Sequence, residues 1–180
     1  MAPLLNLLPC QLGGTRLRRF EAWDLARFGA YRSDASLARF QAWSPMTERA
    51  AREFIEEMAH VAELRQGDWI QLAIAEVASN RIVGDVGMHL AADGSEAEVG
   101  FTLCPEVQGR GHATAAARMA TRLFFQCSQA RLVRGVTDVR NVASIRVLER
   151  AGFEKFSEQR SEFKGELCTE FVYAGPRVDA

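Results

Sequence analysis

The residues with the most chemical potential lie between Glu98 and Thr114, where the chain runs Glu-Val-Gly-Phe-Thr-Leu-Cys-Pro-Glu-Val-Gln-Gly-Arg-Gly-His-Ala-Thr. A strand-like pattern ends here, Gly109 and Gly111 follow, and a helical pattern begins. Glycines let the backbone turn and approach a ligand closely, and the free N–H groups and dipole of a helix N-terminus attract anions. The segment therefore predicts a site for a phosphate-bearing small molecule.

Local charge favours the same interpretation. Residues 107–137 contain five arginines and no Asp or Glu, whereas the whole chain of 180 residues has 22 Lys+Arg, 23 Asp+Glu and a net charge of −1. A basic segment on a nearly neutral protein fits a polyanionic small molecule better than a nucleic acid, and the balance gives no general attraction to acidic membranes. The alternative is a solvated helix face on which the glycines serve only as turn residues.

Two common phosphate-binding patterns do not match. The nucleoside-triphosphate loop GxxxxGK[ST] is absent. The dinucleotide pattern requires Gly or Ala where this chain has Thr114, and an acidic residue about 20 positions later. The next acidic residue is Asp138, so NAD is the weaker alternative.

Two motifs resemble those of the GNAT acetyltransferases. Gln108-Gly-Arg-Gly-His-Ala113 resembles the loop that binds the pyrophosphate of acyl-CoA. Asn141-Val-Ala-Ser-Ile-Arg-Val-Leu-Glu-Arg-Ala-Gly-Phe153 resembles the second signature of that superfamily, in the form found in the branch with the Rim-type ribosomal-protein N-terminal acetyltransferases. The two motifs lie 28 residues apart, from Ala113 to Asn141, with one helix and one strand expected between them.

This resemblance implies both an activity and a set of cofactor contacts. The activity is direct transfer of acetyl from acetyl-CoA to a primary amine, on a protein N-terminus or a small molecule, without a metal. The alternative is a non-catalytic acyl-CoA-binding sensor on the same fold. In the family, backbone groups of the preceding strand pair with pantetheine and loop amides hold the pyrophosphate. The cofactor-binding residues implied here are Phe101, Thr102, Leu103, Gln108, Gly109, Arg110, Gly111, His112, Ala113, Thr114 and Asn141.

The resemblance also suggests the catalytic residues. Many members carry a Tyr seven residues after the Asn as the acid for the leaving thiolate, but this chain has Leu148 there. Ser144 is the remaining hydroxyl and is the expected acid. The amine must lose a proton, and Glu98 occupies the strand position at which several members place their general base. A solvent-facing role for Glu98 is the alternative, and Glu170 is a second candidate base.

The acceptor site is expected against the helical pair between residues 23 and 43, which walls that site in the family. Tyr31 and Trp43 are the predicted acceptor contacts because each has an apolar ring and a polar atom. Other aromatic residues at helical spacing there are expected in the core. The sequence does not identify the acceptor, and the family makes a homodimer an expected state.

Cysteines and histidines indicate no other chemistry. The four cysteines form no CxxC pair and the three histidines no HExxH, so nothing points to a metal site. A nucleophilic Cys104 is disfavoured because no histidine lies near it in the sequence to activate it. Unpaired cysteines in a chain of this size are typical of a reduced compartment, so a cytoplasmic location is expected.

The elements that must position these residues form one mixed α/β (α+β) domain over residues 14–175, with a single, mostly antiparallel sheet flanked by helices. Residues 1–13 are expected to be an irregular apolar tail, without the basic flank of a signal peptide and too short to span a membrane. The predicted strands are 14–20, 68–77, 81–90, 96–104, 132–137, 153–163 and 167–173. The predicted helices are two short ones between 23 and 43 that break at Asp34, one from Thr47 to about Arg65, and those at 112–127 and 141–150.

Overall fold

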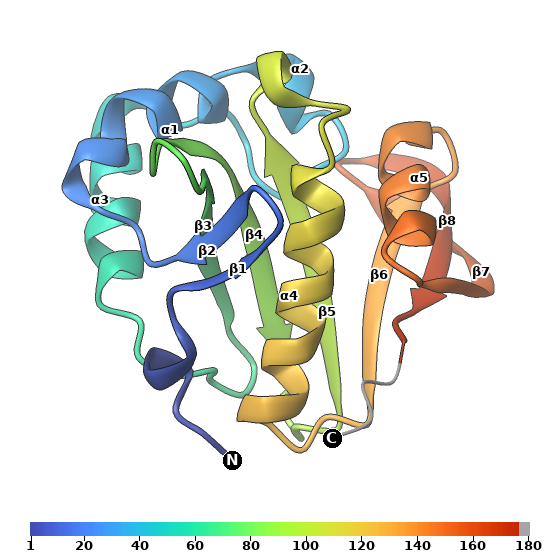
Figure 1. The fold of residues 1–180 in the computed structure, drawn as a ribbon. Coiled ribbons are helices and arrows are strands. Elements are labelled where there is room, and N and C mark those ends of the chain that lie inside the picture. The colour runs from blue at the N-terminus through green and yellow to red at the C-terminus, as the bar shows by residue number, and fades with distance from the viewer. Residues whose placement is uncertain (177–180) are drawn as a thin grey trace.

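The structure is a computed structural model that describes residues 1–176. Its eight strands form one sheet in the order β1-β2-β3-β4-β5-β6-β8-β7 (Figure 1). The strands are β1 (Cys10–Leu12), β2 (Thr15–Arg18), β3 (Trp69–Glu76), β4 (Ile82–Leu90), β5 (Glu96–Leu103), β6 (Leu132–Asp138), β7 (Glu154–Phe163) and β8 (Glu166–Ala174). The helices are α1 (Leu25–Arg32), α2 (Ala35–Ala38), α3 (Glu48–Ala59), α4 (His112–Cys127) and α5 (Val142–Arg150). The predicted fold class and most of the predicted elements are confirmed.

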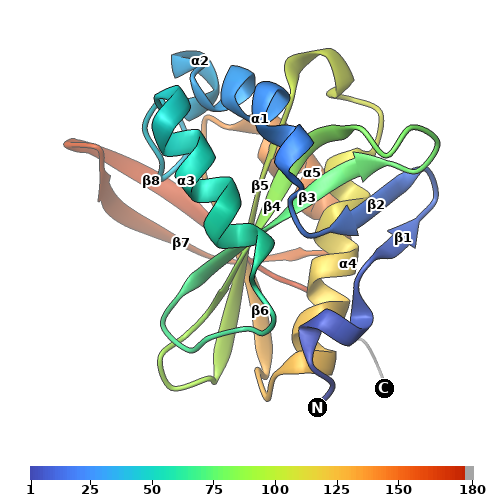
Figure 2. The same cartoon turned by 90° about the vertical axis from the view of Figure 1, so that its left-hand side faces the viewer.

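Helices cover both faces of the sheet. α4 and α5 lie on one face, and α1, α2 and α3 lie on the other (Figures 1 and 2). The buried stripe of α4 consists mainly of small residues, which let the helix approach the sheet closely. These residues are Ala113, Ala116, Ala117, Ala120, Leu123 and Phe124. The core therefore holds the start of α4 firmly beside β5, where the predicted loop lies.

The pairing of β5 with β6 is the only parallel pairing among the strands that the structure describes, and it is short. It joins residues 96–98 of β5 to residues 132–134 of β6. β5 continues to Leu103 and β6 to Asp138, but they no longer pair with each other. The two strands therefore separate over their second halves, and we call this opening the splay.

Helix ends differ from the prediction in two places. Thr47 caps α3 as predicted, since its hydroxyl accepts a hydrogen bond from the N–H of Ala50. However, α3 ends at Ala59 instead of near Arg65. Asp34 interrupts the helices as predicted, because its carboxylate caps α2, but α2 ends at Ala38 and residues 39–46 form an irregular segment.

The N-terminal residues are more ordered than predicted. Leu4–Leu7 form a 3₁₀ helix, and β1 pairs with β2 through Cys10 and Leu17. Leu4 is buried, and the N–H of Ala2 donates to the carbonyl of Gln126 at the end of α4. Leu4 therefore packs in the core of the domain, and Leu7 and Leu8 are partly buried against it. Within residues 1–176, no helix has the length and apolar character needed to cross a membrane.

Candidate active site

The splay leaves backbone groups of β5 without a strand partner. The N–H of Cys104 donates to the carbonyl of Val83, which fixes the phase of the β4–β5 ladder. In an antiparallel ladder alternate residues turn their N–H and C=O away from the neighbour, so Leu103 and Phe101 turn theirs toward the splay. Two glutamine side chains donate to these carbonyls, Gln41 to Phe101 at 3.3 Å and Gln108 to Leu103 at 3.3 Å. Phe101 and Leu103 thus present free or side-chain-bonded backbone groups, whereas Thr102, the third predicted pantetheine-pairing residue, pairs with Asp85 on β4.

A cavity of about 440 Å³ lies where the splay meets the start of α4 and of α5. We call it the loop cavity. Most of the predicted cofactor-binding residues line it. Its lining includes Phe101, Thr102, Leu103, Gln108, Gly109, Gly111, Ala113, Thr114, Asn141 and Ser144. The structure thus brings both sequence motifs to one hollow.

The loop itself has the geometry that glycine makes possible. Gly109 has φ 79° and Gly111, the N-cap of α4, has φ 87°, in the left-handed region that side chains disfavour. A Cβ at either position would meet no atom within 4 Å, so the space beside the backbone is open. The free N–H groups of a 16-residue helix therefore face a cavity that can receive an anion.

Two predicted loop residues have side chains elsewhere. His112 is buried, and its Nδ1 lies 2.9 Å from the Oγ1 of Thr15 on β2. Arg110 is exposed and does not line the loop cavity. Either residue can contribute a backbone amide there, but the imidazole ties α4 to the sheet.

The start of α5 combines two predicted residues. Asn141 caps the helix, and its Oδ1 accepts the backbone N–H of Ser144 at 3.2 Å. This leaves the Asn141 amide nitrogen for a ligand. Among the described residues, the Ser144 hydroxyl has no hydrogen-bond partner, and Ser144 lines the loop cavity. Leu148, at the position where many relatives of the resembled family carry Tyr, is buried and packs against Gly135.

The five arginines of segment 107–137 do not gather at the loop, so that part of the sequence argument is wrong. Arg118 donates to the carbonyl of Arg150, and Arg134 faces Glu96 and Glu98. The arginines that line the loop cavity are Arg146 and Arg150, on α5. Counting charges along one stretch of sequence could not identify these two arginines, because α5 comes next to the loop only in the folded chain.

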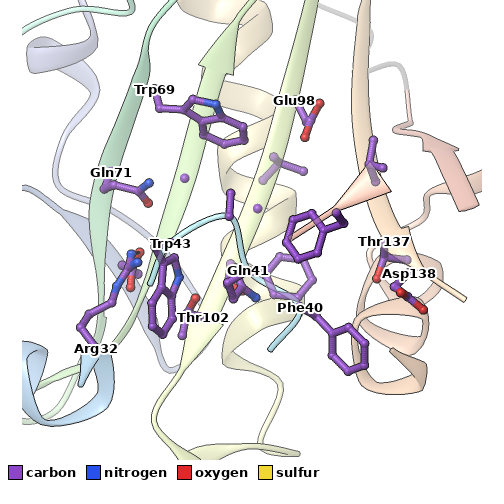
Figure 3. A pocket seen from close by; sticks show the side chains of 18 of the residues that line it. Arg32, Phe40, Gln41, Trp43, Trp69, Gln71, Glu98, Thr102, Thr137 and Asp138 are labelled. Carbon is purple, nitrogen blue, oxygen red and sulfur yellow. Dashed lines mark hydrogen bonds and ion pairs between the residues drawn. The ribbon is translucent and has the colours of Figure 1, made fainter. Parts of the chain in front are cut away.

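A second cavity, of about 360 Å³, lies on the other side of the splay (Figure 3). We call it the aromatic cavity because rings form much of its wall. The aromatic residues in its lining are Phe40, Trp43, Phe54, Trp69, Phe101 and Phe163. The aromatic and loop cavities share Phe40, Gln41, Phe101 and Thr102. The two hollows therefore meet at the splay.

Glu98 and Glu170 both line the aromatic cavity. Burial raises the pKa of the Glu98 carboxyl, Arg134 and His89 lower it, and the charge of Glu170 raises it. The nearest cation is weakly placed, with an Arg134 nitrogen 3.9 Å from Glu98 Oε2. Such a carboxylate is better suited to accept a proton than one held in a tight ion pair.

The structure separates the two predicted acceptor contacts. Trp43 lines the aromatic cavity, but Tyr31 does not, so its assignment was wrong. Tyr31 is buried, and its hydroxyl donates to Asp85 at 2.8 Å. Arg32 forms a buried ion pair with the same carboxylate. The polar atom of Tyr31 is therefore explained by a core hydrogen bond.

A hairpin closes one side of the aromatic cavity. Lys164, at the turn between β7 and β8, donates to the carbonyls of Ala38 at 2.8 Å and Trp43 at 2.9 Å. The hairpin extends toward the side of the sheet on which α2 and α3 lie (Figure 2). Phe163 and Cys168, near the turn, also line the cavity. Lys164 thus ties the hairpin turn to the segment that carries Trp43.

Comparison with known proteins shows the family to which this domain belongs. A model of the acetyltransferase (GNAT) domain matches residues 15–154. The chain is a GNAT acetyltransferase family member. An acetyltransferase of the GNAT family from Bacillus anthracis shares the fold at a TM-score of 0.79 and 20% identity, covering 93% of this chain and 97% of the other.

Two further GNAT structures have more specific descriptions. A spermidine N-acetyltransferase from Vibrio cholerae, in complex with CoA and spermine, has a TM-score of 0.73 and 17% identity, covering 90% of this chain and 95% of that one. A ribosomal-protein-S5-alanine acetyltransferase from Vibrio fischeri has a TM-score of 0.73 and 17% identity, covering 93% and 95%. At these identities the likeness shows the fold, and the two acceptors differ in kind.

Other reactive groups of this GNAT domain are not arranged for catalysis. Cys104 is buried, and burial raises the pKa of its thiol, which favours the unreactive protonated form. All four cysteines are free. Within residues 1–176, no three His, Cys, Asp or Glu side chains are grouped so as to hold a metal ion.

Sequence reasoning missed three residues of this GNAT site. Arg32 and Gln41 come from the segment predicted as a helical pair, where periodicity identified only apolar positions. Lys164 lies in a turn that the sequence did place correctly. Its partners, the carbonyls of Ala38 and Trp43, lie more than 100 residues away, and a backbone carbonyl leaves no sequence signal.

Proposed function

We propose that this chain is an acetyl-CoA-dependent N-acetyltransferase that transfers the acetyl group directly to a primary amine of a protein N-terminus or a small molecule. The observation that carries the proposal is the meeting of the loop cavity and the aromatic cavity at Phe101 and Thr102, in the splay. A cofactor in one and an amine in the other would place their reacting ends together. When both reactants are held in one geometry, the entropic cost of bringing them together from solution is already met by binding.

The residues present fit acetyl-CoA. The open space beside Gly109 and Gly111 can admit a pyrophosphate to the backbone amides of the α4 N-terminus. The carbonyl and N–H groups of Phe101 and Leu103 that face the splay can pair with an extended amide-containing chain. The amide nitrogen of Asn141 is a further donor, and Arg146 and Arg150 are cations beside the cavity.

Bound acetyl-CoA supplies a thioester, from which the acetyl group passes to the amine nitrogen as the sulfur leaves. Side chains of this protein carry out the proton transfers. Glu98 accepts the proton of the bound ammonium, and its raised pKa improves its match to that task. Backbone N–H groups of the splay would stabilise the oxygen on which negative charge develops. The free hydroxyl of Ser144 would give a proton to the leaving sulfur, and the proton that the nitrogen loses as the amide forms would restore that hydroxyl.

The cytoplasm is the proposed location, and the four free cysteines fit a reducing compartment. The named acceptors of the two Vibrio proteins, spermidine and an alanine of ribosomal protein S5, support the reaction class without choosing the acceptor.

The test is turnover by the purified chain. Acetyl-CoA is incubated with a panel of primary amines and short peptides with free N-termini, free CoA thiol is measured, and products are identified by mass spectrometry. The proposal expects amine-dependent thiol release and an acetylated amine. Tight binding of CoA with no acetylation of any amine would instead support the sensor alternative.

A further inference from the structure

The wall of the aromatic cavity contains two buried hydrogen-bond donors that have no partner. They are Nε of Arg32 and Nε1 of Trp43, and neither has a hydrogen bond to any described residue. Both residues line the cavity. Buried polar groups are nearly always satisfied, so a pair of unpartnered donors at a binding cavity indicates that a ligand atom completes them.

These two donors are rigidly held. The guanidinium of Arg32 lies 4.5 Å from the ring centre of Trp43 and 5.3 Å from that of Phe28. It forms an ion pair with Asp85, which also accepts the hydroxyl of Tyr31. Fixed donors favour a ligand that brings an acceptor oxygen to them, because little side-chain freedom remains to be lost.

The opposite end of the cavity has the opposite charge. Figure 3 shows Arg32 and Trp43 side by side, with Glu98 on the far side. Asp85 pairs with Thr102 in the sheet and His89 pairs with Glu98. These positions are four residues apart along the strands, or roughly 13 Å at about 3.3 Å per residue. The cavity thus has a donor end and a carboxylate end.

The carboxylate end is the less neutralised end of the cavity, because Arg134, the cation that faces Glu98, lies 3.9 Å from its carboxylate. The other two acidic residues of the lining are neutralised, Asp85 by Arg32 and Asp138 by a two-point contact with Arg140 at 2.6 and 2.9 Å. Glu170 contacts a neutral amide, that of Gln159 at 3.0 Å. An ammonium group is therefore attracted to the end that holds Glu98 and Glu170.

We propose that the acceptor is an amino-carbonyl compound, with its amine near Glu98 and a carbonyl or carboxylate oxygen, several bonds away, at Arg32 and Trp43. This inference rests on the proposed function and specifies its substrate class. The aromatic walls suit an apolar linker between the two ends. A linear polyamine fits less well, because it has no acceptor oxygen and places a second cation beside the guanidinium.

Matched amines test the proposal. The pairs are 4-aminobutanamide with pentylamine and 6-aminohexanamide with heptylamine, and spermidine is tested beside them. We expect kcat/KM to be at least about tenfold higher for one or both amides than for the alkylamine of the same length, because an analogue without the oxygen leaves buried donors unpaired. Spermidine should be no better than the alkylamines.

Trp43→Phe tests the donor, since it keeps an aromatic ring beside Arg32 and removes the N–H together with the five-membered ring. We expect it to lower kcat/KM about tenfold more for the favoured amide than for the alkylamine, which loses only the contact with part of the ring. Trp69→Phe is the matched control, because the Trp69 nitrogen is not among the unpartnered buried atoms. The control should change amide and alkylamine alike.

The outcomes separate the two proposals. Acetylation of amides and alkylamines at equal rates would overturn the amino-carbonyl assignment and leave the acetyltransferase intact. An equal loss for both amines in Trp43→Phe would also overturn it. Failure to acetylate any amine, in this panel or the broader one, would instead count against the proposed function.

Discussion

Glu98 shows how the environment of one residue suits it to a reaction. The sequence left open whether Glu98 is a base at the active site or a solvent-facing residue of its strand. The structure gives it a partly buried place beside a weak ion pair, and the charges around it act on its pKa in opposite directions. Those opposing effects make its role testable.

If Glu98 is the base, it works only when deprotonated, so kcat/KM should rise with pH through its raised pKa. Arg134 lowers that pKa and Glu170 raises it. Arg134→Gln should therefore move the acidic limb of the pH profile to higher pH, and Glu170→Gln should move it to lower pH. Glu98→Gln should reduce kcat by about 10²–10⁴ at moderate pH and less as pH rises.

The pH profile of kcat/KM for each variant is the measurement. Shifts in the same direction for both neighbours would contradict the assignment of the limb to Glu98. Loss of activity in Glu170→Gln, with Glu98→Gln still active, would move the base to Glu170.

The proposed roles of Ser144 and Asn141 can be tested separately, because the two side chains have different hydrogen-bond partners in the structure. The Ser144 hydroxyl has no partner among residues 1–176, so Ser144→Ala should leave the melting temperature nearly unchanged while lowering kcat. Asn141→Asp keeps an oxygen for the helix cap and loses the amide donor. It should weaken CoA binding with little loss of stability, whereas Asn141→Ala should also lose about 1 kcal/mol of stability.

Calorimetry with CoA, thermal melts and turnover on the same preparations decide this prediction. A lower melting temperature with normal kcat in Ser144→Ala would remove the acid role.

At the scale of elements, the sequence was most informative where one periodicity dominates. The stripe of α4 and the alternation of β5 predicted both elements within a residue or two. It was least informative where an element depends on partners distant in sequence. Residues 39–46 were expected to be helical as far as Trp43. In the structure this segment is irregular, the Trp43 carbonyl accepts a hydrogen bond from Lys164, and the Trp43 ring packs against the Arg32 guanidinium. β1 has only three residues, and its pairing with β2 has no local signature.

Gly111 joins the loop to α4, and its substitution tests the loop cavity as a CoA site. Gly111→Ala puts a Cβ into the open space of the cavity and strains a residue at φ 87°, at a cost of about 1–2 kcal/mol. Gly165 is the matched control, with φ 80° and equally open space but in the β7–β8 turn. Both Ala variants should melt at similarly lower temperatures, and only Gly111→Ala should weaken CoA binding in calorimetry. Equal CoA affinities would place the ligand elsewhere.

The link from Lys164 to residues 38–43 should set the shape of the aromatic cavity. Lys164→Met removes both hydrogen bonds to backbone carbonyls, so the hairpin turn should exchange its amide hydrogens faster and KM for the amine should rise. CoA affinity should not change. Lys155→Met is the control, because Lys155 lies near the other end of the hairpin and contacts Glu158 and Phe171. Unaltered exchange and KM in Lys164→Met would show that the cavity does not depend on this link.

At the scale of the whole molecule, charge was predictable in amount but not in position. The sequence correctly showed a nearly neutral chain with an arginine-rich segment. Folding gives those arginines different surroundings, since Arg118 donates to the carbonyl of Arg150 at the end of α5 whereas Arg134 lies beside the carboxylates of β5. The fold brings Arg146 and Arg150 to the loop cavity, from a helix that ordinary amphipathic patterning explains. The cations expected beside the loop cavity are therefore Arg146 and Arg150, and not the arginines of segment 107–137.

This reassignment gives a prediction for cofactor binding. The double variant Arg146→Gln with Arg150→Gln should bind CoA about tenfold more weakly at low salt, because two cations beside the cavity are lost. Arg131→Gln, a loss from the arginine-rich segment far from the cavity, should bind CoA normally.

Raising the ionic strength shortens the screening length from about 10 Å at 0.1 M to about 3 Å at 1 M. The native affinity should therefore fall with salt toward that of the double variant, whose own affinity should change less. Calorimetric titration at both ionic strengths makes the comparison, and a parallel decline in both proteins would show that the exposed charges of α5 do not hold the phosphates.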